Sequence, residues 1–330
     1  MLEHGGRLLR ASLDYGIARG DWLDLSSGIA PWAYPIPEIP HAAWARLPET
    51  EDGLEQAARA YYGATQLLPV AGSQAAIQAL PLLRARSRVG VLSPCYAEHP
   101  HAWQRAGHEL LALADEQVEA ALDSLDVLLL VNPNNPTGRL LPRAQLLDWH
   151  ARLAARGGWL VVDEAFIDND PRQSLADCAE RSGLIVLRSF GKFFGLAGVR
   201  LGFVLAEADL LQRLADYLGP WTIAGPTRVL GQACLADGAT HDLQRIRCAA
   251  ASRRLAEQLS GAGLPPSGGC DLFQYLRLPQ AAQLHDFLAR RGILVRLFED
   301  PAALRLGLPP SAADERRLGQ ALAAYQKDHP

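Results

Sequence analysis

Short apolar runs alternate with amphipathic stretches between residues 70 and 205 of the 330-residue chain. Six of these runs have the length and composition of buried β-strands. They are "VGVLSP" (89–94), "ELLALA" (109–114), "DVLLLVNP" (126–133), "GWLVVDEAF" (158–166), "LIVLRSF" (184–190) and "VRLGFVLA" (199–206). A helical pattern at 141–158 separates the third run from the fourth. The pattern predicts an α/β fold with a mostly parallel sheet covered by helices on both faces.

The pattern differs on either side of this region. The first fifty residues are rich in Pro and Trp and are predicted to be irregular, with a helix following at about 53–62. Three long helices are predicted at 207–218, 226–236 and 240–261. After a break at "SGG" (267–269), we expect strands at 272–278, 293–298 and 303–308 and helices at 280–291 and 312–325. This last part predicts a smaller α+β domain.

Composition and charge exclude several classes of function. The chain is 49% hydrophobic and carries a net charge of −4, without a run of Lys or Arg that would attract nucleic acid. Its apolar runs are too short to span a membrane, and its beginning does not resemble a signal peptide. The five cysteines form no CxxC pair, so we expect reduced thiols in the cytoplasm and no metal site.

The sequence uses lysine in only two places, although it has 32 lysine and arginine residues in total. Lys327 lies in a polar tail, whereas Lys192 lies in "RSFGKFFGLAGVR" (188–200), among glycines and phenylalanines. Arginine would supply charge equally well, but it cannot act as a neutral amine. A lysine in an apolar environment can lose its proton and form a Schiff base with a carbonyl. We therefore predict that Lys192 bonds covalently to an aldehyde.

Polar residues follow other predicted strands, where ligands bind in parallel sheets. Asn135 lies in the rigid turn "VNPNNPTG" (131–138) and either presents its amide to a ligand or only shapes the turn. Asp163 ends an apolar strand, and a buried carboxylate there needs a cationic or hydrogen-bonding partner, although it could instead cap a helix.

An anion site is predicted where Gly72, Ser73 and Gln74 open a helix, with Ser189 and Arg200 close to Lys192 in the sequence. An aldehyde on Lys192, an acid for a pyridinium nitrogen and a phosphate cradle together indicate pyridoxal 5′-phosphate (PLP). Tyr96 could stack on the ring of this cofactor or be an ordinary core aromatic.

The motifs "NPNNPTG", "VVDEAF", "SFGKFFGLAGVRLG" and "LRLG" resemble the aspartate aminotransferase superfamily, the fold type I PLP enzymes, and are most similar to the histidinol-phosphate aminotransferase branch. The resemblance implies a large PLP domain (46–236), a small domain with an N-terminal arm (1–45 and 237–330), and a homodimer. It implies that Lys192 carries the cofactor. The residues implied to contact the cofactor are Asp163 at the pyridine nitrogen, Asn135 at the phenolic oxygen, Tyr96 on the ring, and Gly72, Ser73, Gln74, Ser189 and Arg200 at the phosphate.

Several positions differ from the aminotransferase pattern. Phe166 replaces a tyrosine, Gly191 replaces a common serine, and Leu47 replaces the tyrosine expected from the partner subunit. Gly28 and Ala30 stand in a segment that usually contains asparagine. These differences argue against efficient transamination but leave PLP binding intact.

Two further motifs, "HGG" (4–6) and "DEAFID" (163–168), are similar to the L-threonine-O-3-phosphate decarboxylases of cobalamin biosynthesis. The resemblance implies that His4, Gly5 and Asn135 help to hold the substrate. It also implies that Arg296 and Arg305 bind its phosphate and carboxylate, which suits the paired donors of arginine.

The expected reaction is decarboxylation of L-threonine O-3-phosphate to 1-amino-2-propanol O-2-phosphate. One alternative is a histidinol-phosphate-like aminotransferase that uses the same lysine and arginines. Another is a PLP-binding protein of the cobalamin pathway that is non-catalytic or depends on a partner. Docking with the next enzyme of the pathway stays open.

Overall fold

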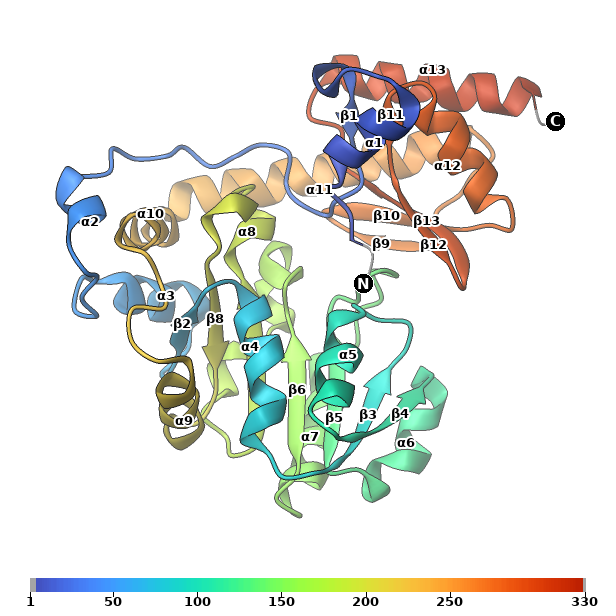
Figure 1. Cartoon of the computed structure of the whole chain (residues 1–330). Helices are drawn as coiled ribbons and strands as arrows, with labels where there is room; N and C mark the ends of the chain where they lie inside the picture. The colour runs from blue at the N-terminus through green and yellow to red at the C-terminus, as the bar shows by residue number, and fades with distance from the viewer. Residues whose placement is uncertain (1–3, 329–330) are drawn as a thin grey trace. The chain divides into compact units, whose positions relative to one another are not determined.

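A seven-stranded sheet forms the centre of the larger of two units in the computed structural model, which describes residues 4–328 (Figure 1). This unit comprises Tyr34–Asn135 and Leu140–Asp242. The strand order is β2-β8-β7-β6-β5-β3-β4, and only β8 runs antiparallel to its neighbours. The strands are β2 (Leu68–Val70), β3 (Arg88–Leu92), β4 (Glu109–Leu113), β5 (Val127–Val131), β6 (Trp159–Asp163), β7 (Leu184–Ser189) and β8 (Gly202–Leu205). The mostly parallel sheet is therefore confirmed, and all six predicted strands are present.

Both faces of this sheet are buried, because alternate residues of each central strand enter two different apolar cores. One face packs against α4 (Ser73–Ala79), α5 (Glu98–Arg105) and α9 (Ala208–Leu218). The other packs against α3 (Leu54–Tyr62), α6 (Val118–Ala121), α7 (Arg143–Ala154) and α10 (Gly225–Ala236). Two short helices, α2 (His41–Ala45) and α8 (Phe190–Phe193), complete the unit. Figure 1 shows α4 and α5 in front of the sheet.

The second unit comprises Met1–Ala33, Pro136–Arg139 and Leu243–Pro330. Its antiparallel sheet has the order β12-β13-β10-β9, and a separate parallel pair joins β1 to β11. Its strands are β1 (Leu23–Asp24), β9 (Gly268–Cys270), β10 (Phe273–Arg277), β11 (Ile293–Leu294), β12 (Arg296–Glu299) and β13 (Ala302–Gly307). Its helices are α1 (Leu8–Tyr15), α12 (Ala281–Ala289), α13 (Ala312–Asp328) and most of α11 (Gly238–Gly261). Within residues 4–328, no helix is both long and apolar enough to cross a membrane.

Three details of the sequence prediction are wrong. The first fifty residues are not irregular, since α1 and α2 lie within them, and Gly16 ends α1 in the left-handed conformation with φ 66°. The predicted break at 267–269 includes most of the short strand β9. The predicted strand at 293–298 is two strands, because β11 pairs with β1 whereas β12 pairs with β13.

Candidate functional site

Most predicted cofactor residues lie at one edge of the large sheet. Asp163 and Ser189 are the last residues of β6 and β7, and Asn135 follows the carboxyl end of β5. Because β8 is antiparallel, its beginning lies at the same edge, where Gly202 pairs with both Ser189 and Val70. The topology of the sheet thus brings these separate segments together.

Asp163 is buried, with 2% of its surface exposed, and lies at the centre of this edge. Its Oδ2 is 2.8 Å from Nε2 of His99, and its Oδ1 accepts a hydrogen bond of 3.1 Å from the backbone N–H of Ala165. An ionised carboxylate only accepts hydrogen bonds, so His99 donates to it. His99 is itself 1% exposed. The predicted partner of the buried Asp163 is therefore a histidine from α5, which the sequence gave no reason to select.

Lys192 lies in α8, directly after β7, with its side chain partly buried. Its Nζ lies 5.8 Å from the centre of the Phe166 ring, so the phenylalanine that replaces tyrosine forms part of the surroundings of the lysine. Gly191 has a physical reason: a Cβ there would lie 2.6 Å from the Cα of Ala197. A serine at position 191 would therefore require the backbone to shift.

Arg200 and the Gly72–Ser73 turn meet at the edge of the sheet. A Cβ on Gly72 would lie 2.6 Å from Nη2 of Arg200, and a Cβ on Gly202 would lie 2.4 Å from the backbone nitrogen of Ser73. Gly72 has φ 70°, which favours glycine, and Ser73 begins α4 as predicted.

The backbone of Arg200 is in the left-handed region, with φ 57° and ψ 50°, and Arg200 lies just before β8 rather than within it. Its Nη1 donates a hydrogen bond of 3.0 Å to the carbonyl of Ala197. A non-glycine residue is held in this conformation only at a cost of roughly 1–3 kcal/mol, and such residues concentrate at functional sites. The segment therefore aims the Arg200 guanidinium at the Gly72 turn.

Tyr96 and Gln74 contact each other. The Tyr96 hydroxyl donates to Oε1 of Gln74 at 3.3 Å, and Nε2 of Gln74 donates to Glu98 at 3.0 Å. The Gln74 side chain is thus engaged with protein partners, so its contact with an anion would come from its backbone N–H. The Tyr96 ring also lies edge-on to His99, with 6.1 Å between the ring centres. Tyr96 is therefore next to the residue that holds Asp163.

The asparagines of "NPNNPTG" have different surroundings. Asn132 is buried and exchanges two hydrogen bonds with the backbone of Leu141, at 3.1 and 2.8 Å. Asn134 donates to the carbonyl of Pro94 at 2.9 Å. These two side chains hold the loop, while Asn135 is partly buried beyond them. The role of Asn135 in binding a ligand stays a prediction.

Of the predicted substrate residues, Asn135 belongs to the large unit, and the others lie in the second unit. There, Ser26 connects two of them. Nη2 of Arg305 donates a hydrogen bond of 3.0 Å to the Ser26 carbonyl. A Cβ on Gly5 would lie 2.2 Å from the same carbonyl oxygen, and the backbone N–H of Gly6 donates to Oγ of Ser26 at 2.7 Å. Only glycine allows the "HGG" segment, which begins with His4, to cross Ser26 this closely. The structure therefore brings "HGG" next to Arg305.

Arg296 and Arg305 are directly opposite each other on β12 and β13. Directly opposed residues of an antiparallel pair point to the same face of the sheet. The Cζ of Arg296 lies 5.2 Å from the ring centre of Phe298, and that of Arg305 lies 5.2 Å from the ring centre of Phe273. The two guanidinium groups are thus held on aromatic side chains of one sheet face.

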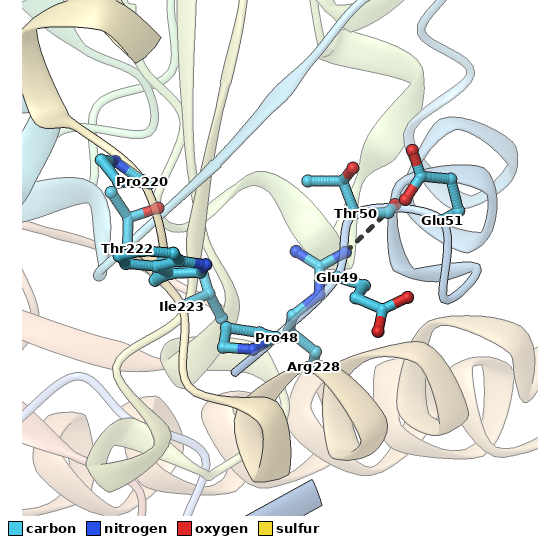
Figure 2. A pocket seen from close by; sticks show the side chains of 9 residues that line it. Pro48, Glu49, Thr50, Glu51, Pro220, Thr222, Ile223 and Arg228 are labelled. Carbon is cyan, nitrogen blue, oxygen red and sulfur yellow. Dashed lines mark hydrogen bonds between the residues drawn. The ribbon is translucent and has the colours of Figure 1, made fainter. Parts of the chain in front are cut away.

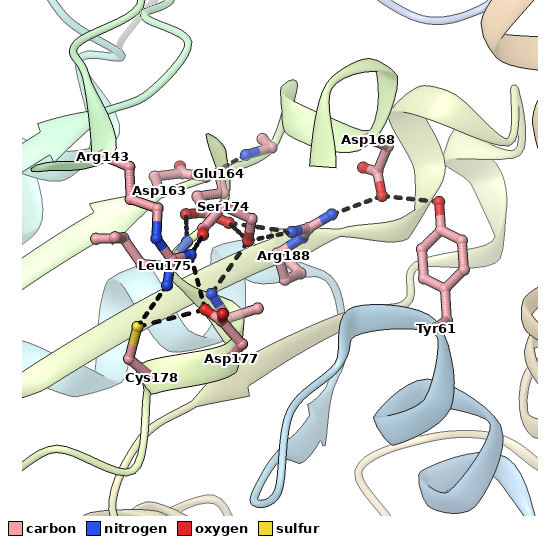
Figure 3. Close-up of polar contacts among 12 residues, drawn as sticks. Tyr61, Arg143, Asp163, Glu164, Asp168, Ser174, Leu175, Asp177, Cys178 and Arg188 are labelled. Atoms are coloured by element: carbon pink, nitrogen blue, oxygen red, sulfur yellow. Dashed lines mark hydrogen bonds and ion pairs between the residues drawn. The ribbon is translucent and has the colours of Figure 1, made fainter. Parts of the chain in front are cut away.

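A buried ionic network is formed by side chains that include Glu164 and Arg188, the sequence neighbours of Asp163 and Ser189 (Figure 3). The guanidinium of Arg188 donates to Glu164 at 3.0 Å, to Asp168 at 2.6 Å and to Ser174 at 3.0 Å. The Tyr61 hydroxyl also donates to Asp168, at 3.0 Å. Burial lowers the pKa of Arg188, but Asp168 and Glu164 outweigh it and raise that pKa. Sequence reasoning missed this network, although a charged residue inside the apolar run "LIVLRSF" was a usable signal.

A cavity of about 300 Å³ opens elsewhere on the large unit (Figure 2). It is lined by residues 48–51 and 220–223 and by Arg228, which forms ion pairs with Asp52 and Glu55. None of the predicted cofactor or substrate residues lines it. Among the described residues, no group of three or more His, Cys, Asp or Glu side chains is arranged to hold a metal ion.

The chain belongs to the aminotransferase class I and II family, whose model matches residues 42–322. It is 62% identical to the threonine-phosphate decarboxylase of Pseudomonas aeruginosa, over 99% of both chains. It is 44% identical to the threonine-phosphate decarboxylase of a Sinorhizobium species, over 98% of both chains. Its fold is similar to that of the histidinol-phosphate aminotransferase of Sinorhizobium meliloti in complex with pyridoxal-5′-phosphate, with a TM-score of 0.86 and 19% identity over 100% of this chain and 96% of the other.

Proposed function

We propose that the protein is a PLP-dependent lyase that converts L-threonine O-3-phosphate to 1-amino-2-propanol O-2-phosphate and carbon dioxide, as a step of cobalamin biosynthesis. The observation that carries this proposal is the 62% identity, from end to end, to a threonine-phosphate decarboxylase. It is also the function predicted from "HGG" and "DEAFID". We further propose that the enzyme works in the cytoplasm, where its five free cysteines would stay reduced.

The residues at the edge of the large sheet fit PLP. Gly72 leaves space that the Arg200 guanidinium occupies, and this guanidinium with the Ser73 N–H and the Ser189 hydroxyl forms a donor set suited to a phosphate. Lys192 supplies the amine that bonds to the cofactor, and Asp163 supplies a carboxylate that would accept a hydrogen bond from the protonated ring nitrogen. When bound, PLP supplies an electron-accepting ring that stabilises negative charge at the substrate Cα.

Three side chains are proposed to keep the cofactor in place. Asp163 faces the ring nitrogen, and the hydrogen bond of 2.8 Å from His99 fixes the orientation of its carboxylate. Tyr96, beside His99, is proposed to cover one face of the ring. Asn135 is proposed to donate to the phenolic oxygen, and Phe166, near the Lys192 amine, cannot add a hydroxyl at this place. We expect PLP binding with fewer polar contacts than the aminotransferase pattern provides.

Arg305 and Arg296 are proposed to hold the two anionic groups of the substrate. Their position on one sheet face lets each make paired hydrogen bonds to a carboxylate or phosphate. A fixed carboxylate decides which bond of Cα breaks, because orientation of the reacting bond controls the outcome. His4 and Gly5 reach this place through Ser26. Lys192, once released, is proposed to return a proton to Cα.

We also propose that the enzyme is a homodimer. Ile36, Trp44, Leu47 and Trp221 are between 61% and 66% exposed, which is unusual for large apolar side chains of one unit. Trp221 lines the cavity described above, and Leu47 directly precedes Pro48, another of its lining residues. A second copy of the chain would cover them. Docking with the next enzyme of the pathway stays a prediction.

The two lysines of the chain provide a matched test. Purified wild-type enzyme and Lys327→Arg are expected to release carbon dioxide from threonine phosphate, whereas Lys192→Arg is not. Borohydride reduction of the holoenzyme should attach the cofactor to the peptide that contains Lys192 and leave Lys327 unmodified, as read by mass spectrometry. An active Lys192→Arg, or cofactor attached to Lys327, would contradict the proposal.

A further inference from the structure

A row of four residues crosses the antiparallel sheet of the second unit. Arg296 of β12 is opposite Arg305 of β13, which is opposite Tyr275 of β10, which is opposite Gly268 of β9. Directly opposed residues share a face, with Cβ atoms about 4.5–5.5 Å apart. Tyr275 therefore stands beside Arg305, in the same row as both arginines that are proposed to bind the substrate. Gly268 ends the row without a side chain, and a Cβ there would lie 2.3 Å from the carbonyl of Thr137.

The hydroxyl of Tyr275 is buried and makes no hydrogen bond within residues 4–328. Tyr275 is 4% exposed, and its ring packs edge-on against Phe298 with 6.3 Å between centres. A buried hydroxyl without a partner costs about 1–3 kcal/mol, so a phenylalanine would be the better residue for packing alone. By contrast, the preceding residue, Gln274, donates hydrogen bonds to Ser252 at 2.7 and 3.2 Å.

Two properties suit this hydroxyl to an anion. Burial raises the pKa of Tyr275, so the hydroxyl keeps its proton and can donate. The arginines next to it in the row attract a negatively charged group to the place where a hydrogen bond to charge is strong. Phe298 and Phe273 lie on the same face and carry the two guanidinium groups. An oxyanion bound by the arginines would thus also find a neutral donor.

We propose that Tyr275 is a substrate-binding residue whose hydroxyl donates to an oxyanion held by Arg305 and Arg296. The inference rests on the proposed function, since the oxyanion is then the carboxylate or the phosphate of threonine phosphate. Tyr275 adds a third donor residue to Arg296 and Arg305. It comes from β10, which none of the sequence motifs contains.

The variant Tyr275→Phe tests this role, because it removes the hydroxyl and keeps the ring. In the holoenzyme, the Kd for threonine phosphate is expected to rise about tenfold, the size of one hydrogen bond to a charged group. The melting temperature should stay the same or rise, because the lost hydroxyl had no hydrogen-bond partner among residues 4–328. Tyr15→Phe is the control: its hydroxyl donates to Asp286, and its loss should leave the substrate Kd unchanged.

Comparing two ligands shows whether Tyr275 binds the phosphate or the carboxylate. If Tyr275 binds the phosphate, the variant loses affinity for 1-amino-2-propanol phosphate, which lacks the carboxylate, as much as for threonine phosphate. If it binds the carboxylate, affinity for this product is unchanged while affinity for threonine phosphate still falls. A threonine phosphate Kd within twofold of wild type overturns the proposal, and so does a melting temperature several degrees lower.

A failure of the proposed function gives a different result. In that case the wild-type holoenzyme shows no affinity for threonine phosphate, and inorganic phosphate becomes the probe of the arginine row. The cradle at Arg200 is then filled by the cofactor, so added phosphate reports on the row. Weaker phosphate binding by Tyr275→Phe than by wild type still supports an oxyanion donor, and equal binding overturns it.

Discussion

Replacing Arg188 by methionine tests how the buried ionic network supports the site. Arg188 is 2% exposed and joins β7 to Glu164, Asp168 and Ser174 (Figure 3). Glu164 directly follows Asp163 in the sequence, and Arg188 directly precedes Ser189. The substitution keeps much of the side-chain volume but removes the guanidinium that donates to Glu164 and Asp168. We expect lower stability and weaker cofactor binding together.

The size of the effect follows from what remains after the substitution. Removing one partner of a buried ion pair leaves an uncompensated charge and costs about 3–5 kcal/mol. Burial already raises the pKa of Glu164, and the loss of Arg188 would raise it further. A folded-state pKa above the ordinary value of 4.5 makes the folded variant bind more protons than its unfolded chain. The free energy of unfolding of the variant should therefore fall as the pH rises above that value.

Urea unfolding at about pH 5 and about pH 8, followed by circular dichroism, measures both effects. Arg172→Met is the matched control, because the Arg172 side chain is 88% exposed and its ion pair with Asp170, at 3.0 Å, lies on the surface. Its free energy of unfolding should change by less than about 0.5 kcal/mol. A loss below about 1 kcal/mol for Arg188→Met, equal at both pH values, would show that Arg188 does not compensate the buried carboxylates.

Three further variants test the site. His99→Phe removes the donor to Asp163, so a cofactor titration should show a Kd raised about tenfold, and an unchanged Kd would exclude the role of His99. Gly191→Ser should lower the free energy of unfolding by about 1–3 kcal/mol, because its Cβ would meet Ala197; a stable variant with tighter cofactor binding would contradict this. Gly5→Ala should raise KM for threonine phosphate without changing the cofactor Kd. A KM equal to that of wild type would show that "HGG" does not contribute to substrate binding.

The sequence predicted the central sheet well, because its strands are buried on both faces and appear as continuous apolar runs. It also predicted that Asp163 needs a buried partner, since a carboxylate at the end of such a run is costly alone. The partner itself, His99, could not be selected, because it comes from a helix 64 residues away and no local pattern marks it. Pairing between distant segments is decided by the topology of the sheet.

The antiparallel sheet shows the same limit. Arg296 and Arg305 could be named from their motifs, but the division of 293–298 into β11 and β12 depends on pairing with β1 and β13. Within "LFQYLRL", Tyr275 resembles any aromatic residue of a strand. Only the register between β10 and β13 shows that it is opposite Arg305. Gly5 likewise has a reason only once the Ser26 carbonyl is seen against it.

The product ratio from L-threonine O-3-phosphate with the purified holoenzyme distinguishes decarboxylation from transamination. We expect one carbon dioxide for each 1-amino-2-propanol phosphate, no keto acid, and cofactor that stays in its pyridoxal form throughout. Formation of a keto acid, with the cofactor converted to its pyridoxamine form and no carbon dioxide released, would contradict this expectation and assign the protein to the aminotransferases.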